Sequence, residues 1–290
     1  MTIKTVTIGI CAPASGFERE KFLSSVKFLK SLGLKVVYND SIFTQCGYLA
    51  GDDSLRAREL NALFANPDVD VIMCARGGYG SSRIVDKLDK HHIRSAGKIF
   101  IGASDVCALM YELEKEATCE IYFGPFVTEM TPGMDSASLD LFKKIIIDGV
   151  TSHKVTGLHT LKKGRVEAEV TGGCLSIIQS TLMTPYETAT DEKILFLEDV
   201  NEPLYKIDRM LTQLKRACKF KHIKGVMVGS FKGLDACTET FYTLLDDIFG
   251  DYNIPIVTEF PSGHGAKKHL IPFKKKVILD ADEGTLEYLG

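Results

Sequence analysis

The feature that most constrains the fold is an alternation of largely apolar segments with amphipathic ones over the first 130 residues. Strand-like apolar segments occupy 5–13, 34–40, 69–75 and 98–103. Helix-like segments follow them at 18–33, 52–67, 81–92 and 105–116. Apolar strands that are joined through helices form a parallel sheet with helices on both sides. The first part of the chain is therefore predicted to be an α/β domain.

The alternation loosens after residue 130, and the second part of the chain is mixed α/β and richer in strand. A helix at 139–149 leads into a polar stretch at 150–164, and we interpret 131–165 as a linker. This divides the chain into an N-terminal domain at 1–130 and a C-terminal domain at 166–290. In the latter, helices are expected at 172–182 and 203–218, and strands at 193–200, 223–231, 254–260, 277–280 and 285–289.

Charge and hydropathy exclude several classes of partner. The net charge is −3, so no basic surface is expected for nucleic acid. No apolar run approaches the roughly 18 residues of a membrane helix. The first residues alternate as a strand does, and no secretory cleavage signal follows them. We therefore expect a cytoplasmic protein that binds neither membrane nor nucleic acid.

The chain has 8 cysteines, but none are spaced as C-x-x-C and none lies near a histidine at zinc-ligand spacing. Most fall inside apolar segments. This pattern is typical of small buried side chains in a reducing compartment. We expect neither a disulfide framework nor a metal site, and no motif calls for a cofactor.

The glycine-rich segment CARGGYGSSR, at 74–83, follows an expected strand and opens an expected helix. It approaches the dinucleotide fingerprint G-x-G-x-x-G, but Arg83 replaces the third glycine and no acidic residue ends the next strand. Two other interpretations remain open. The segment is either a tight turn that needs positive φ, or a nest of backbone amides that holds a developing oxyanion.

Ser104 lies where the strand at 98–103 turns directly into a helix. It could cap that helix, although Cys107 occupies the position where a capping box has Glu or Gln. It could also be a nucleophile, because Gly102-Ala103-Ser104 matches the first half of the G-x-S-x-G elbow. A serine nucleophile requires a base and a group that orients the base.

One histidine and one pair of acids are placed to assist such a serine. His264 lies between two glycines just after the expected strand at 254–260. Glu198 and Asp199 end the expected buried strand at 193–200, where a carboxylate needs a partner. Physical reasoning alone does not choose between these two acids.

Four blocks, in this order and spacing, strongly resemble the LD-carboxypeptidases, a family of serine peptidases. The blocks are CARGGYGSSR, GASDVCALM, FLEDVNEPLYKIDRMLTQL and FPSGHG, and the likeness runs from GICAPAS to VILDADEG. The resemblance implies a Rossmann- or flavodoxin-like parallel-sheet N-terminal domain and a smaller, strand-rich α/β C-terminal domain. It also implies release of a terminal D-amino acid, usually D-alanine from murein tetrapeptide during cell-wall recycling, and a homodimer.

Carried over by position, the resemblance makes Ser104 the nucleophile, Glu198 the orienting acid and His264 the base. It places an oxyanion hole at the amides of Asp105 and of Gly77 or Gly78. The terminal carboxylate of a peptide is usually bound by a cationic side chain. Arg76, Arg83 and Lys267 are the candidates.

The sequence leaves the substrate open. A second branch of the family resembles microcin C immunity proteins, which cleave a peptidyl-nucleotide. The lack of tryptophan weakens that interpretation, since a nucleobase is often stacked on an aromatic ring. A non-catalytic protein that binds a nucleotide or a peptide is the alternative outside enzymes.

Overall fold

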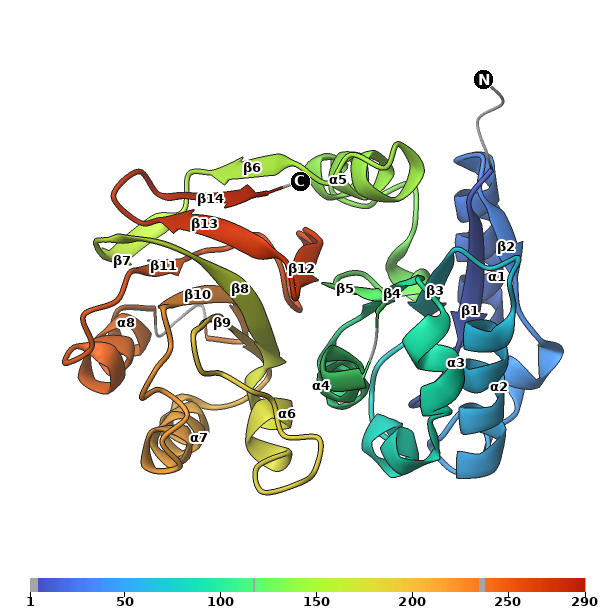
Figure 1. Ribbon diagram of the computed structural model, residues 1–290, viewed down its shortest axis with the longest axis horizontal. Helices are drawn as coiled ribbons and strands as arrows, with labels where there is room; N and C mark the ends of the chain where they lie inside the picture. Colours follow the sequence, from blue (N-terminus) through green and yellow to red (C-terminus); the bar gives the residue numbers. More distant parts are fainter. Residues whose placement is uncertain (1–4, 117, 235–237, 290) are drawn as a thin grey trace. The chain divides into compact units, whose positions relative to one another are not determined.

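The computed structural model describes residues 5–116, 118–234 and 238–289 (Figure 1). The chain forms two compact units, residues 1–149 and residues 150–290. No helix in this described part is both long and apolar enough to cross a membrane.

The N-terminal unit contains a parallel sheet with the strand order β5-β4-β3-β1-β2. The strands are β1 (Thr7–Cys11), β2 (Lys35–Val37), β3 (Val71–Cys74), β4 (Ile99–Gly102) and β5 (Glu120–Phe123). This 2-1-3-4-5 order is the flavodoxin-like one, so the predicted α/β class is confirmed. The strand order reverses between β1 and β3, which is where open α/β sheets bind their ligands.

Helices connect these strands. They are α1 (Arg19–Ser31), α2 (Asp53–Ala65), α3 (Lys90–Ser95), α4 (Cys107–Glu116) and α5 (Ser136–Phe142). Shorter turns of helix are η1 (Asp40–Phe43), η2 (Ser81–Lys87), η3 (Ser104–Val106), η4 (Val127–Glu129) and η5 (Lys143–Ile147). Helix α3 contacts both α2 and α4, whereas α1 packs with η4. Helices therefore cover the sheet, as expected for strands that are apolar throughout.

The C-terminal unit contains a mixed sheet with the order β6-β14-β13-β8-β9-β10-β11-β7. Its strands are β6 (His153–Thr156), β7 (His159–Lys162), β8 (Arg165–Cys174), β9 (Lys193–Val200), β10 (Gly225–Lys232), β11 (Ile256–Thr258), β13 (Lys276–Asp280) and β14 (Thr285–Tyr288); a short strand, β12, spans Ile271–Phe273. Strands β8 to β11 are parallel, and the outer pairs are antiparallel. The predicted strand-rich α/β class is confirmed.

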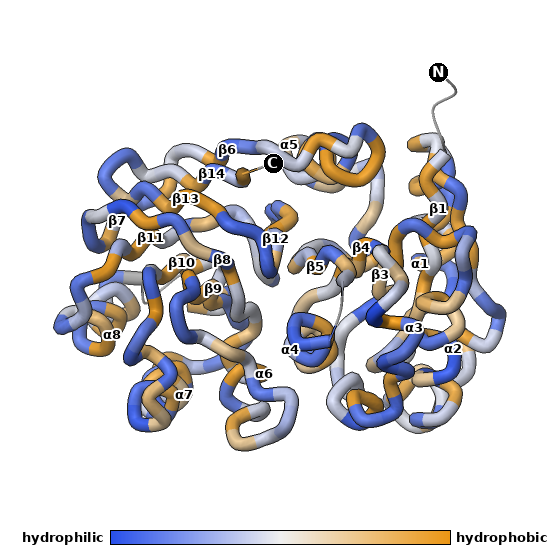
Figure 2. The backbone as a smooth tube through the Cα atoms, viewed as in Figure 1, coloured by the Kyte–Doolittle hydropathy of each residue, from blue (hydrophilic) through white to orange (hydrophobic). Residues whose placement is uncertain are grey.

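The described residues of this unit form the helices α6 (Leu175–Ser180), α7 (Leu204–Arg216) and α8 (Thr238–Phe249). Helix α7 buries four residues at positions i, i+3, i+4 and i+7, namely Ile207, Met210, Leu211 and Leu214. Hydrophobic and hydrophilic segments accordingly alternate along α7 (Figure 2). It packs between α6 and α8, which it contacts on either side.

The structure differs from several of the segments that the sequence predicted. The helix expected at 81–92 is η2 followed by α3, because Asp89 accepts the backbone N–H of His91 at 3.0 Å and starts a new helix. Residues 172–174, expected to begin a helix, end strand β8. The segment expected as a linker, 131–165, contains α5 and η5 in the first unit and β6 and β7 in the second.

Candidate active site

The candidate residues fall in two groups, one in each unit. The first group lies in the loops after β1, β3 and β4, at the carboxyl edge of the parallel sheet. Ser15, after β1, donates its backbone N–H to Gly77 O at 3.2 Å, and its Oγ accepts Tyr79 N–H at 3.0 Å. The loops after β1 and β3 are thus joined at the point where the strand order reverses.

Ser104 has φ 52°, a left-handed conformation that a non-glycine residue rarely adopts. It follows extended Ala103 and is the first residue of η3. The N-cap position of η3 falls on Ala103, which makes no side-chain capping bond, so Ser104 is not the cap. A strained serine on a sharp strand-to-helix turn is what the nucleophile elbow requires.

The glycine loop lies directly beside this serine. A Cβ on Gly77 would lie 3.1 Å from Ser104 Cβ and 2.9 Å from Phe126 Cζ, so only glycine fits there without a shift. Gly78 and Gly80 have φ values of 108° and 128°. The interpretation as a tight turn with positive φ is therefore confirmed, and the loop leads into the 3-10 helix η2 rather than an α-helix.

The amides of the glycine loop are available to a ligand. Among the described residues, none accepts a hydrogen bond from Gly77 N–H or Gly78 N–H. The Gly77 carbonyl is held by Ser15, and because the peptide is planar and trans, the Gly78 N–H points the opposite way. Asp105, the next residue after Ser104, is in the first turn of η3, where backbone N–H groups lack helical partners.

The second group is a buried acid and a histidine in the C-terminal unit. Strand β9 places Glu198 in the interior with 0% exposure. Its Oε2 accepts His264 Nδ1 at 2.6 Å and His264 backbone N–H at 3.1 Å. A Cβ on Gly263, which has φ 108°, would lie 2.9 Å from Glu198 Oε2. The loop after β11 therefore needs glycine there to approach the carboxylate closely.

The neighbouring acid does something different. Asp199 accepts the backbone N–H of Ser176 at 2.8 Å and that of Val200 at 2.8 Å. Ser176 is in the first turn of α6, so Asp199 stabilises the start of that helix. Glu198, and not Asp199, is the acid that contacts His264.

The electrostatics of the pair favour a basic imidazole. Burial lowers the pKa of His264, but the hydrogen bond and charge of Glu198 outweigh it, so the pKa lies above its usual value. Burial raises the pKa of Glu198, and the contacts from His264 oppose this. Because Nδ1 donates to the carboxylate, the unprotonated nitrogen of neutral His264 is Nε2.

The three candidate cations differ in their surroundings. Arg83 is exposed and makes a bidentate pair with Asp53, with N–O distances of 2.9 to 3.1 Å. Arg76 is exposed and donates to Gly16 O at 2.9 Å. Lys267 is exposed in the loop that follows His264. Arg83 is therefore the least free of the three to bind a substrate.

Sequence reasoning missed two residues that contact this region. Phe126 packs against Gly77, and Ser15 holds the glycine loop through three hydrogen bonds, one to Gly77 and two with the backbone of Tyr79. Ser15 falls within GICAPAS, so its position after β1 was the available signal. No group of three or more metal-ligating side chains occurs in the part of the chain that the structure describes.

Two family models match this chain. Residues 8–124 match the LD-carboxypeptidase N-terminal domain, and residues 167–279 match the LD-carboxypeptidase C-terminal domain. Together with the two α/β units, these matches define a peptidase. The chain belongs to the LD-carboxypeptidase family, as its four sequence blocks indicated.

Individual proteins show the same relationship. A probable murein peptide carboxypeptidase of Bacillus subtilis is 32% identical over 289 residues, covering 96% of this chain and 90% of that protein. The solved muramoyltetrapeptide carboxypeptidase of Oxalobacter formigenes is 26% identical, with a TM-score of 0.86 and 97% of each chain covered. The microcin self-immunity protein MccF, solved with aspartyl sulfamoyl adenosine, is similar in fold, with a TM-score of 0.89 at 22% identity over 98% of this chain and 96% of that one.

Proposed function

We propose that this chain is a serine-type LD-carboxypeptidase that releases the terminal D-alanine of a murein tetrapeptide. The names of the Bacillus subtilis and Oxalobacter formigenes proteins support this substrate class. The proposed role is cell-wall recycling in the cytoplasm, with no cofactor. The homodimer stays a prediction that light scattering can check.

The observation that carries the proposal is the backbone of Ser104. A φ of 52° at a serine is strained, and it occurs at the carboxyl end of a parallel strand, beside a glycine loop with unused amides. Strain of this kind costs on the order of 1–3 kcal/mol and is concentrated at functional sites. A serine that only filled space at this turn would gain nothing from that conformation.

In the proposed mechanism, Ser104 Oγ attacks the carbonyl carbon of the amide and His264 Nε2 takes its proton. Glu198 holds the imidazole in the tautomer with the proton on Nδ1 and stabilises the imidazolium that forms. His264 then returns the proton to the leaving amine of the D-amino acid. Water attacks the acyl-enzyme in the same way and restores Ser104.

The oxyanion of each tetrahedral intermediate is assigned to two backbone amides, that of Asp105 and that of Gly77 or Gly78. Each such donor contributes on the order of 10²–10³ in rate. The terminal carboxylate of the peptide is assigned to Arg76 or Lys267 ahead of Arg83, because Arg83 already pairs with Asp53.

A second candidate is hydrolysis of an aminoacyl- or peptidyl-nucleotide. The solved complex of MccF with aspartyl sulfamoyl adenosine favours it, because that protein is similar in fold along nearly the whole chain. Tyrosine and phenylalanine would have to supply the stacking for the nucleobase, since the chain has no tryptophan. A non-catalytic binding protein remains the third candidate.

One experiment separates the three candidates. The protein is incubated with L-Ala-D-Glu-meso-diaminopimelate-D-Ala, and separately with a peptidyl-adenylate analogue, and products are followed by mass spectrometry. We expect loss of D-alanine from the peptide, and a fall of roughly 10⁴-fold or more in Ser104→Ala. Ser82→Ala, a half-buried serine of the same loop region, is the matched control. Binding of either compound without turnover would favour the non-catalytic protein.

A further inference from the structure

Asp105 carries a feature that the proposed mechanism does not use. Only its backbone amide has a role there, yet its side chain is inside the N-terminal unit, and the residue is 2% exposed. A buried carboxylate is costly unless it is hydrogen-bonded. The partners of this carboxylate therefore indicate what it does.

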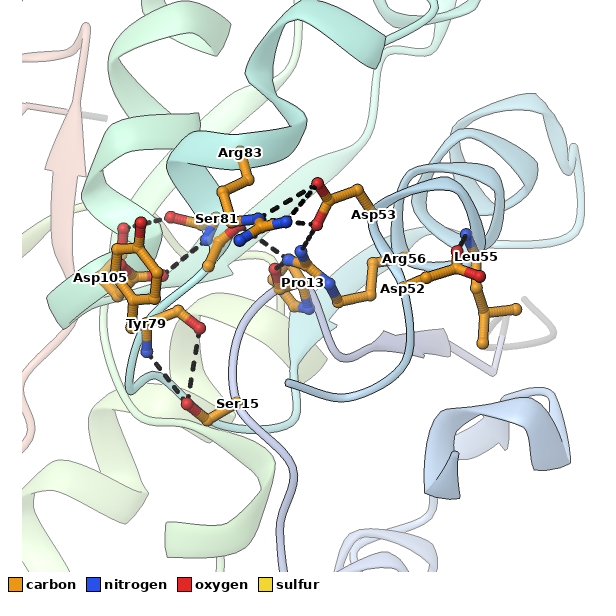
Figure 3. A network of polar contacts seen from close by, with 11 residues as sticks. Pro13, Ser15, Asp52, Asp53, Leu55, Arg56, Tyr79, Ser81, Arg83 and Asp105 are labelled. Carbon is orange, nitrogen blue, oxygen red and sulfur yellow. Dashed lines mark hydrogen bonds and ion pairs between the residues drawn. The ribbon is translucent and has the colours of Figure 1, made fainter. Parts of the chain in front are cut away.

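The carboxylate binds the far end of the glycine loop. Its Oδ2 accepts the backbone N–H of Ser81 at 2.8 Å, and Ser81 Oγ in turn donates to the Asp105 carbonyl. Figure 3 shows Asp105 and Ser81 facing one another through both contacts. Burial raises the pKa of Asp105, and the hydrogen bond from the Ser81 backbone N–H opposes the shift.

A second group holds the same loop from the other side. The buried guanidinium of Arg56 donates to Gly80 O at 2.7 Å and to Pro13 O. Arg56 is itself paired with Asp53 (Figure 3). Gly80 has no room for a side chain, because a Cβ would lie 2.5 Å from Leu49 Cδ2.

The loop is thus fixed at both ends relative to the serine turn. At one end Gly77 contacts Ser104, and at the other Ser81 is bound to Asp105. The amides of Gly77 and Gly78 lie between these two attachments. Their distance from the amide of Asp105 depends on the attachment at Ser81.

We infer that the Asp105 side chain is a positioning residue, which holds the loop of residues 77–81 so that its amides and the Asp105 amide converge on one oxyanion. This inference rests on the proposed serine mechanism. It assigns the Asp105 carboxylate a role through the backbone, without contact to the substrate. Loss of this carboxylate should therefore destabilise the transition state, which lowers kcat, and leave substrate binding nearly unchanged.

The test uses Asp105→Ala and Asp105→Asn, with kcat and KM for D-alanine release measured on the full chain. We expect Asp105→Ala to lower kcat about 10²-fold with KM changed by less than about threefold. Asp105→Asn should fall between this variant and the unchanged protein, because an amide oxygen can still accept the Ser81 N–H. A peptide boronic acid that forms a tetrahedral adduct should lose affinity in parallel with kcat.

A matched control separates positioning from simple stability. Asp135 caps α5 and accepts Ser138 N–H at 2.9 Å and Ser138 Oγ–H at 2.8 Å in the same unit. Asp135→Ala should lower the melting temperature and leave kcat of the folded fraction unchanged. If Asp105→Ala does not fold, Ser81→Ala removes only the hydroxyl contact and is expected to lower kcat about tenfold.

The outcomes keep the two proposals apart. An active Ser104→Ala variant would overturn the serine mechanism. If Ser104→Ala is inactive while folded Asp105→Asn and Ser81→Ala retain the full kcat and boronate affinity, the positioning role is wrong and the mechanism stands. A rise in KM with kcat unchanged would likewise contradict the positioning role.

Discussion

His264 donates two hydrogen bonds to a single oxygen of Glu198, from Nδ1 at 2.6 Å and from its own backbone N–H at 3.1 Å. The other oxygen, Oε1, is buried and has no hydrogen-bond partner among the described residues. One carboxylate oxygen therefore fixes both the backbone and the ring of this histidine. The proposed mechanism depends on that contact, and it can be tested directly.

Glu198→Gln is expected to lower kcat by roughly 10³–10⁴-fold with the fold intact. The amide keeps the size of the side chain but removes the charge that supports the imidazolium, and it can favour the wrong tautomer of His264. Steady-state release of D-alanine measures the effect. Glu287→Gln, at an exposed position on β14, serves as control. A Glu198→Gln variant within about tenfold of full activity would refute the assignment of the acid.

The pH profile of kcat/KM should show an acidic limb centred above pH 6.5, the ordinary pKa of histidine. The base form of His264 is required, and its pKa is raised, so activity is lost as the pH falls through that raised value. In Glu198→Gln the residual activity should persist to lower pH, because burial and the charge of Lys268 lower the pKa of His264 and only the charge of Asp199 then opposes them. An acidic limb that stays in place in this variant would contradict the prediction.

Gly77→Ala is expected to lower kcat by about 10²-fold and to destabilise the fold by about 1–3 kcal/mol. The new methyl group would lie 2.9 Å from Phe126 Cζ and 3.1 Å from Ser104 Cβ, so the loop or the serine must move. Gly133→Ala is the control, since its Cβ would meet only Thr131 Oγ1 at 3.9 Å. Thermal unfolding and D-alanine release measure the two effects. Equal behaviour of both variants would count against the close packing at Ser104.

A thiol-modifying reagent is expected to label the exposed cysteines and to leave the buried ones unlabelled. Cys46 and Cys218 are exposed, whereas five others are buried, namely Cys11, Cys74, Cys107, Cys119 and Cys174. Burial, with Cys11 3.9 Å away, raises the pKa of Cys74, so its thiolate is scarce. Peptide mapping after brief alkylation should find label on Cys46 and Cys218 and none on Cys74. Rapid labelling of Cys74 in the folded protein would be the contrary result. Cys237 lies outside the described residues.

Much of the N-terminal unit could be predicted from the sequence, because its strands are apolar and its helices carry local signals. Helix α2, for example, begins after Asp52, whose carboxylate accepts Leu55 N–H at 2.7 Å. Elements without such signals were missed, among them β5, the edge strands β6 and β7, and helix α8. At the start of α6 the sequence was misleading. Gly172 and Gly173 belong to β8, where a Cβ on Gly172 would lie 2.1 Å from Phe196 O.

The candidate site shows the same division between local and distant information. Ser104 and His264 stand in recognisable local contexts, a strand-to-helix turn and a glycine-flanked loop. The choice between Glu198 and Asp199 could not come from the strand itself, because it depends on which side of β9 the His264 loop approaches. The Asp105–Ser81 contact joins residues 24 apart and depends on the path of the glycine loop between them.

The two carboxylates at the end of β9 have a consequence for how this chain can change. Successive side chains of a strand point to opposite faces, so Glu198 and Asp199 are separated by the parity of their positions. In the observed pairing of β8 with β9, Glu198 lies opposite Cys174. A slip of one residue in this pairing would exchange the faces on which the two carboxylates lie. The shorter aspartate would then face the histidine loop, and the glutamate would face the start of α6. An insertion or deletion within β9 would therefore remove the acid from the histidine even though both carboxylates were kept.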